Sequence, residues 1–159
     1  MSLNIRPAVP EDAALIMRFV RALAAYEQLL HAVEASEADI ARELFGPAPR
    51  VFCEIAEWDG APVGFALWFY TFSTFRGRQG IWLEDLFVDP EARGRGIGKA
   101  LLRQLAQRCV REELGRFEWW VLDWNAPSIG FYQAQGGQLQ QDWTRVRVDG
   151  EALQRLAAQ

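Results

Sequence analysis

The most informative segment of the sequence is Val88-Asp89-Pro90-Glu91-Ala92-Arg93-Gly94-Arg95-Gly96-Ile97-Gly98-Lys99, which lies between an apolar strand pattern and a long helical pattern. Glycines at alternate positions let a backbone approach a ligand closely. The helix that follows presents unpaired N–H groups and the positive end of its dipole. Arg93 and Arg95 add side-chain charge. The segment therefore predicts a pyrophosphate-binding loop, and a glycine-rich turn without a ligand is the alternative.

Two common phosphate-binding motifs do not fit this loop. A Walker loop in the same register needs glycine at position 93 and serine or threonine at position 100, where the chain has Arg93 and Ala100. The dinucleotide fingerprint needs its third glycine at position 99, which is Lys99. The loop is therefore of neither type.

Outward from the loop, strand and helix patterns alternate along the chain. Strands are expected over residues 3–6, 50–58, 63–72, 81–88 and 117–122, and a last strand carries Trp143, Val146 and Val148. Helices are expected over residues 10–26, 36–45, 97–115 and 127–135, with a brief helix after Asp149. Asp59-Gly60 predicts a hairpin turn, and residues 73–80 predict a loop. This order indicates an α/β fold with a mixed central sheet.

Length, composition and charge limit the class of protein. A chain of 159 residues with 50% hydrophobic and 24% charged residues is typical of one globular domain, here spanning 1–159. The net charge of −4 repels nucleic acid and anionic lipid and favours cationic partners. We therefore expect partners that are neither nucleic acid nor membrane.

Cysteine usage and the N-terminus point to a reducing, cytoplasmic location. Cys53 and Cys109 are the only cysteines, too few for a disulfide framework or a four-thiolate zinc site. They form no metal-ligand spacing with His31, the single histidine, so no metal is expected. Residues 1–6 do not read as a signal peptide, and no window approaches 18 apolar residues.

Together with three further segments, the loop is similar to a known family. Residues 93–98 resemble the acetyl-CoA pyrophosphate loop of the GNAT superfamily of N-acetyltransferases. The other segments are Leu83-Glu84-Asp85-Leu86-Phe87-Val88, Trp124-Asn125-Ala126-Pro127-Ser128-Ile129-Gly130-Phe131-Tyr132 and Ala24-Ala25-Tyr26-Glu27. In this order they resemble the diamine (spermidine/spermine) and thialysine acetyltransferase branch. The similarity covers nearly the whole chain.

The resemblance implies a cofactor site for acetyl-CoA. In the family, the strand before the loop splays from its neighbour and its backbone pairs with the pantetheine arm. Leu86, Phe87 and Val88 hold that position in this chain. The pyrophosphate would lie against Arg93, Gly94, Arg95, Gly96, Ile97, Gly98 and Lys99. Further cofactor contacts are implied for Asn125, Ser128 and Tyr132.

Tyr132 also matches the family's general acid. A coenzyme A thiolate has a proton affinity near that of a cysteine thiol, about 8.5, and a tyrosine near 10 stays protonated at neutral pH. The difference of roughly 1.5 pKa units is small enough for a local shift to remove. The alternative is that Phe131 and Tyr132 only pack the short helix on the sheet.

Glu84 matches the family residue that accepts the proton of the amine through water. A primary amine titrates near 10.4, so presenting the neutral nucleophile at pH 7 requires a proton acceptor. Asp85 is expected on the opposite face of the same strand because strand side chains alternate. A solvated strand edge or a helix-capping contact is the alternative for this acidic pair.

Tyr26 and Glu27 match residues that line the family's acceptor site, together with Glu84 and Asp85. A carboxylate and an aromatic face suit an aliphatic cation, although the end of an amphipathic helix is the plainer interpretation. For Trp119 and Trp120 we expect core packing rather than substrate contact. His31 matches no motif position.

The loop over residues 71–80 departs from the polyamine enzymes of the family. Its Arg76 and Arg78 are expected beside the acceptor entrance, where they would oppose a long polycation. The acceptor is therefore left open among a diamine, a polyamine and a lysine analogue such as thialysine.

The resulting hypothesis is an acetyl-CoA-dependent N-acetyltransferase that acts on a small cationic amine. Its alternatives are acetylation of a protein N-terminus or lysine, and a coenzyme A-binding module without catalysis. The resemblance also implies a homodimer. Thioester aminolysis needs no metal when hydrogen-bond donors polarise the carbonyl.

Overall fold

The computed structural model describes residues 1–158, which form two compact units divided after Trp124. The first unit contains a five-stranded sheet in the order β1-β2-β3-β4-β5. Its strands are β1 (Leu3–Pro7), β2 (Phe52–Trp58), β3 (Ala61–Ser73), β4 (Arg78–Val88) and β5 (Phe117–Glu118). Strands β1 to β4 pair in antiparallel fashion, and β5 joins β4 in parallel. The predicted α/β class with a mixed sheet is confirmed.

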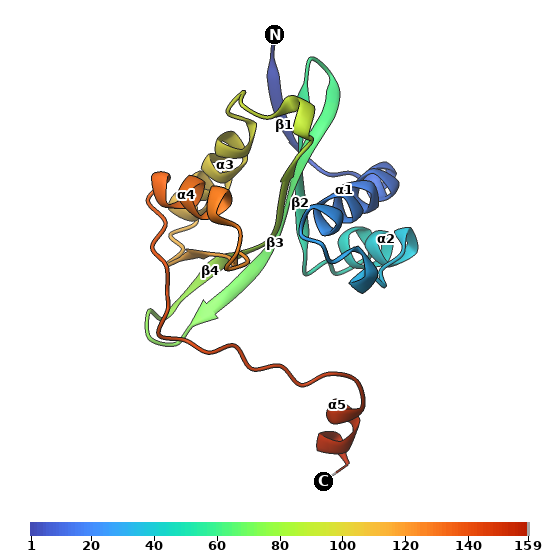
Figure 1. Cartoon of the computed structure of the whole chain (residues 1–159), viewed down its shortest axis with the longest axis vertical. Coiled ribbons are helices and arrows are strands. Elements are labelled where there is room, and N and C mark those ends of the chain that lie inside the picture. The colour runs from blue at the N-terminus through green and yellow to red at the C-terminus, as the bar shows by residue number, and fades with distance from the viewer. Residues whose placement is uncertain (159) are drawn as a thin grey trace. The chain divides into compact units, whose positions relative to one another are not determined.

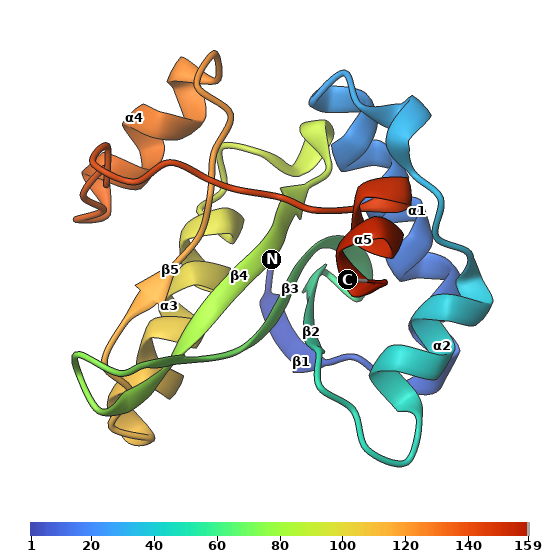
Figure 2. The ribbon, with the colours of Figure 1, turned by 90° about the horizontal axis from the view of Figure 1, so that it is seen from below.

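Helices cover both faces of this sheet. On one face lie α1 (Ala13–Tyr26) and α2 (Glu37–Phe45), and on the other lies α3 (Ile97–Arg111), as Figure 1 and Figure 2 show. Short 3-10 turns, η1 (Pro10–Asp12), η2 (Leu30–Ala32) and η3 (Pro90–Ala92), lie between these elements. The described residues contain no helix that is long and apolar enough to cross a membrane.

Aromatic packing fixes α1 on the sheet. The Phe19 ring stacks on Phe65 at a centroid distance of 5.3 Å and lies 5.9 Å from Phe87 of β4. All three side chains are buried. Their burial removes a large apolar area from water, which stabilises the helix–sheet contact. It also ties α1 to the carboxyl-terminal part of β4.

The predicted apolar face of α3 is buried except at its end. Ile97, Leu101, Leu102 and Leu105 are buried, whereas Val110 is 80% exposed. Val110 follows Leu105 by five residues, which turns it about 140° away from that side chain at 3.6 residues per turn. The prediction was therefore wrong for Val110.

Two predicted connections have different outcomes. The hairpin turn at Asp59-Gly60 is confirmed, because both residues have the positive φ angles, 49° and 81°, of a tight turn. The predicted loop over residues 73–80 is shorter than expected. β3 and β4 pair as far as Ser73 with Arg78, which leaves only residues 74–77 as a turn.

The second unit contains α4 (Ala126–Ala134) and α5 (Gly150–Ala157). The brief helix predicted after Asp149 is confirmed, but the last predicted strand is wrong. Residues 137–149 contain neither helix nor strand, and Trp143 and Val146 are 80% and 84% exposed. Alternation alone does not make a strand, because its backbone groups need a partner strand.

Candidate active site

Strands β4 and β5 separate soon after they meet. Their pairing is limited to Ile81 with Phe117 and Trp82 with Glu118. β4 continues to Val88, whereas β5 ends at Glu118. The β4 edge over residues 83–88 is therefore not paired with β5, and its main-chain groups on that side suit an extended ligand. The predicted splayed strand pair is confirmed, and Leu86, Phe87 and Val88 lie on this edge.

A β-bulge in β4 redirects the side chains at Glu84 and Asp85. Trp68 pairs with Leu83, and the adjacent Leu67 pairs with Asp85, so Glu84 is the extra residue. The predicted strict alternation of Glu84 and Asp85 is therefore wrong. The cause is a register shift, which a period-two pattern does not reveal.

Three carboxylates gather around the bulge. Burial, together with the charges of Glu84 and Glu27, raises the pKa of the partly buried Asp85 to about 7. Burial also raises the pKa of Glu27. Trp82 Nε1 donates a hydrogen bond of 2.9 Å to Glu84 Oε2. The end of α1 and the bulge of β4 thus form a negative cluster that favours a cation.

The end of α1 also supplies an aromatic ring to this region. Tyr26 is the last residue of α1, and Glu27 follows it as the C-cap. The Tyr26 ring lies 6.3 Å from the Trp124 ring and 5.3 Å from the guanidinium carbon of Arg93. The four residues predicted for the acceptor site are therefore brought together by two elements, α1 and β4.

The predicted phosphate-binding loop has the backbone of an anion site. Gly94 and Gly96 have φ angles of 77° and 76°, and an added Cβ at either position would meet no atom within 4 Å. Glycine is therefore required by conformation rather than by lack of space. Gly96 is the N-cap of α3, where the structure shows neither a side-chain cap nor an acidic residue in the first turn. The first N–H groups of α3 thus fit a pyrophosphate.

The side chains of the loop have additional structural roles. Arg93 Nε donates to the Val88 carbonyl at 2.9 Å, and its guanidinium lies 5.7 Å from the Phe87 ring. The Arg95 guanidinium lies 5.3 Å from the Trp58 ring. Ile97 is buried in the core, so its contribution to a ligand is limited to the backbone. Lys99 is exposed, and Gly98 lies within the first turn of α3.

Asn125, Ser128 and Tyr132 belong to the second unit. The buried Asn125 caps α4, with its Oδ1 accepting a hydrogen bond from the Ser128 N–H at 3.4 Å. Tyr132 lies within α4, and its ring is 5.5 Å from that of Phe131. Sequence reasoning missed the cap, although an asparagine followed by Ala126-Pro127 is a typical helix start.

The sequence matches the model of the acetyltransferase (GNAT) family over residues 17–136. The chain belongs to the GNAT acetyltransferase family. Thialysine N-epsilon-acetyltransferase of Mus musculus is 35% identical over 98% of this chain and 98% of its own length. L-ornithine N5-acetyltransferase of Arabidopsis thaliana is 28% identical over 96% of this chain and 87% of its own length.

This GNAT enzyme is also similar in fold to solved structures. An integron cassette protein from the mobile metagenome of V. cholerae has a TM-score of 0.82 and 26% identity, covering 100% of this chain and 99% of that one. Both the predicted family and the predicted acetyltransferase class of enzyme are confirmed.

Trp82 and Trp120 border the GNAT site, although the sequence analysis assigned neither of them to it. Trp120 is 59% exposed and meets Trp82 edge to face, with the ring centroids 4.7 Å apart. The prediction of core packing is therefore wrong for Trp120, whereas Trp119 packs on Phe117 at 4.8 Å. Trp82 could have been predicted as a site residue because it precedes Glu84 by two residues on the same strand, where side chains at i and i+2 share a face.

The arginines of the β3–β4 hairpin lie away from the carboxylate cluster. Arg78 Nη1 donates to the Glu113 carbonyl at 2.9 Å, at the end of α3. Arg78 precedes Glu84 by six residues, roughly 20 Å along a strand. The prediction that Arg76 and Arg78 flank the acceptor entrance is therefore wrong, and so is the argument that they oppose long polyamines.

Other candidate groups lie outside the site. His31 is exposed in η2. Cys53 and Cys109 are free thiols, and burial raises the pKa of Cys53 well above its usual range. Among the described residues, no three metal-ligating side chains form a group that could hold a metal.

Proposed function

We propose that this GNAT enzyme transfers the acetyl group of acetyl-CoA to the primary amine of a small cationic metabolite. The carboxylate cluster of Glu27, Glu84 and Asp85 carries the proposal, because it favours a cation. Glu84 and Asp85 lie on β4, the strand that leads into the phosphate-binding loop, and Glu27 follows the end of α1. Glu84 precedes Val88 by four residues, roughly 13 Å along that strand. Relatives named for thialysine and for ornithine support this class of acceptor.

The proposed donor site uses backbone groups. The loop glycines and the first N–H groups of α3 bind the pyrophosphate, and the edge of β4 over residues 86–88 pairs with the pantetheine arm. Bound in this way, acetyl-CoA supplies a thioester whose C–S bond breaks as the amine nitrogen forms the new C–N bond. The assignments of Asn125 and Ser128 to the cofactor rest on the family resemblance.

The cluster provides two carboxylates for the proton of the ammonium group. Glu84 is the predicted acceptor through water, and the pKa of Asp85, which is raised to about 7, supports this residue as a second base at neutral pH. In the proposal, Asp85 and Glu84 share this task, and Glu27 and Tyr26 hold the rest of the cation. The coenzyme A sulfur receives its proton from the Tyr132 hydroxyl, and the second proton that the nitrogen loses as the amide forms restores this hydroxyl.

Tyr132→Phe is expected to lower kcat about tenfold and to leave the Kd for acetyl-CoA within about twofold. The effect is modest for a general acid because a thiolate with a proton affinity of about 8.5 is already a fair leaving group. Steady-state rates and calorimetric titration of acetyl-CoA measure the two quantities. An unimpaired variant would contradict the general-acid role.

Trp82→Phe is expected to raise KM for the amine several-fold because it removes the hydrogen bond that orients Glu84. The phenyl ring keeps an aromatic contact with Trp120, so the fold is retained. Initial rates over a range of amine concentrations separate KM from kcat. Equal kinetics in the variant and the native enzyme would show that Glu84 needs no such support.

An acetyl-transfer screen tests the function itself. Labelled acetyl-CoA is offered with thialysine, ornithine, lysine, putrescine, spermidine, spermine and aminoglycosides, and in parallel with a cell lysate. We expect labelled product from one or more of the small amines. Label only in lysate proteins would favour a protein acceptor, and binding of acetyl-CoA without any product would favour a module without catalysis.

We also propose that the two units act as one domain and that the protein is a homodimer. The family match spans residues 17–136 and so crosses the division after Trp124. Residues 139–156 expose several large apolar side chains, including Trp143 and Leu156, which suit a protein interface. Sedimentation equilibrium is expected to give twice the 18.1 kDa of one chain. A monomer at micromolar concentration would contradict the dimer.

A further inference from the structure

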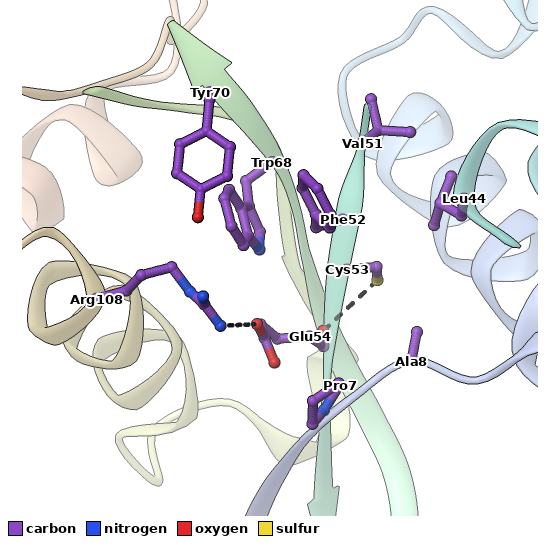
Figure 3. A pocket seen from close by; sticks show the side chains of 10 residues that line it. All are labelled: Pro7, Ala8, Leu44, Val51, Phe52, Cys53, Glu54, Trp68, Tyr70 and Arg108. Carbon is purple, nitrogen blue, oxygen red and sulfur yellow. Dashed lines mark hydrogen bonds and ion pairs between the residues drawn. The ribbon is translucent and has the colours of Figure 1, made fainter. Parts of the chain in front are cut away.

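A cavity lies apart from the proposed active site. It measures about 160 Å³ and is bordered by β2, β3 and the side of α3 that carries Arg108 (Figure 3). None of its lining residues belongs to the carboxylate cluster or to the phosphate-binding loop. A void of about 150 Å³ accommodates a molecule of benzene size. The cavity therefore has room for about five or six non-hydrogen atoms.

Glu54 is a buried and only partly paired carboxylate in this cavity. Its side chain is 4% exposed, and Oε2 accepts no well-aligned hydrogen bond from the described residues. Burial raises the pKa of Glu54, and the Trp68 and Gln104 side chains, which lie close to this carboxylate, partly offset that rise. Oε1 lies 3.8 Å from Arg108 Nη2, which is a long ion pair. Arg108 makes its short bond elsewhere, donating from Nη1 to Glu112 Oε1 at 2.9 Å. A buried carboxylate oxygen without a well-aligned donor is costly, so the site favours a ligand that donates.

An aromatic wall stands beside this carboxylate. The ring centroids of Phe52 and Trp68 are 4.8 Å apart, and Tyr70 meets Trp68 edge to face at 5.1 Å. In Figure 3 the Glu54 side chain leaves β2 toward Arg108, on the side where Trp68 and Tyr70 also lie. Aromatic faces attract organic cations and also bury aliphatic carbon.

We propose that this cavity binds a small alkylammonium ion, with the ammonium group donating to Glu54 Oε2 and the alkyl chain lying against Phe52, Trp68 and Tyr70. A carboxylate ligand is disfavoured by Glu54, because Arg108 is engaged with Glu112. A neutral hydroxyl makes a weaker bond to the carboxylate than a charged donor does. The site is separate from the acceptor site, so it offers the enzyme a second place to sense an amine.

The test uses butylammonium as the probe and 1-butanol as its neutral match. The intact 15N-labelled protein is titrated by NMR, and the Trp68 indole N–H resonance, identified with Trp68→Phe, reports on the cavity. We expect butylammonium to shift this resonance in a saturable way and 1-butanol to bind at least tenfold more weakly. Equal binding of the two probes, or no shift, would overturn the proposal.

Matched variants assign the binding to Glu54. Glu54→Gln keeps the shape of the side chain but removes its charge, and it is expected to weaken butylammonium binding at least tenfold. Glu27→Gln, in the acceptor cluster, is expected to leave the Trp68 titration unchanged. Should Glu54→Gln fold poorly, Phe52→Leu removes part of the wall and is expected to weaken binding about threefold. An unchanged affinity in the variants of this cavity would contradict the site, and a failed acetyl-transfer screen would not affect this readout.

Discussion

Asp85→Asn is expected to lower kcat/KM for the preferred amine by about 100-fold to 1,000-fold, in the lower part of the range for loss of a positioned base. Asparagine keeps the size of the side chain but accepts no proton. Burial and the neighbouring Glu84 and Glu27 raise the pKa of Asp85 to about 7, close to the pH at which a base is most useful. Glu84→Gln, measured in parallel, shows how the two carboxylates divide the task.

The pH dependence gives this prediction a second readout. Only the ionised Asp85 accepts a proton, so kcat/KM of the native enzyme is expected to fall about tenfold per pH unit below its pKa of about 7. The Asp85→Asn variant is expected to lack this inflection. A variant that keeps both the rate and the inflection would assign the base elsewhere.

Measuring the stability of Asp85→Asn shows whether its lower activity is a catalytic effect or a result of unfolding. The pKa of Asp85 in the folded protein is raised from its usual value of 3.8, so folding favours the neutral carboxyl. That stabilisation is present below pH 3.8 and is lost as the pH rises through about 7. Asparagine stays neutral, so Asp85→Asn is expected to be more stable than the native protein at pH 8, by at least about 1 kcal/mol. Thermal unfolding at pH 4 and pH 8 measures the difference.

Gly96→Val is expected to weaken acetyl-CoA binding about 100-fold. Gly96 has a φ of 76°, which a β-branched residue adopts only with strain, and it is the N-cap of α3. Relief of that strain would move the loop and turn the first N–H groups of α3 away from the pyrophosphate. Calorimetric titration of acetyl-CoA measures the loss.

Gly60→Val is the matched control for this variant. Gly60 also has a positive φ, 81°, and an added Cβ would meet no atom within 4 Å, but it lies in the β2–β3 turn. We expect a similar loss of stability with unchanged acetyl-CoA affinity. Equal affinity losses in the two variants would mean that the Gly96 effect is one of folding and not of cofactor binding.

The glycine loop that we propose to bind phosphate could be predicted from sequence because its backbone conformation is set by neighbouring residues. Alternating glycines before a helix with Leu101 and Leu105 on one face specify both the backbone conformation and the helix that follows. The wrongly predicted last strand shows the limit of such local patterns. Val146 and Val148 alternate like a strand, but a strand forms only where another chain segment pairs with it, and such pairing is not encoded in a short window.

The residues of the carboxylate cluster could be predicted from the sequence, but their electrostatic interactions could not. Tyr26, Glu27, Glu84 and Asp85 were assigned by resemblance to the family. The bulge that breaks the alternation of Glu84 and Asp85 arises from the register of β3 against β4. The coupling of Glu27 to Asp85 arises because the end of α1 packs near β4. Glu54 belongs to no sequence motif. Its ion pair with Arg108 is long, because Arg108 makes its short hydrogen bond with Glu112.

The sequence by itself determined the family, the class of fold and the glycine turn before α3, because these depend on residue order over a few turns or strands. Tertiary structure alone decided which carboxylates feel one another, where β4 and β5 part, and which buried groups lack partners. The physical reason is distance: burial and Coulomb interactions depend on separation in space, which residues far apart in the chain acquire only when they fold together.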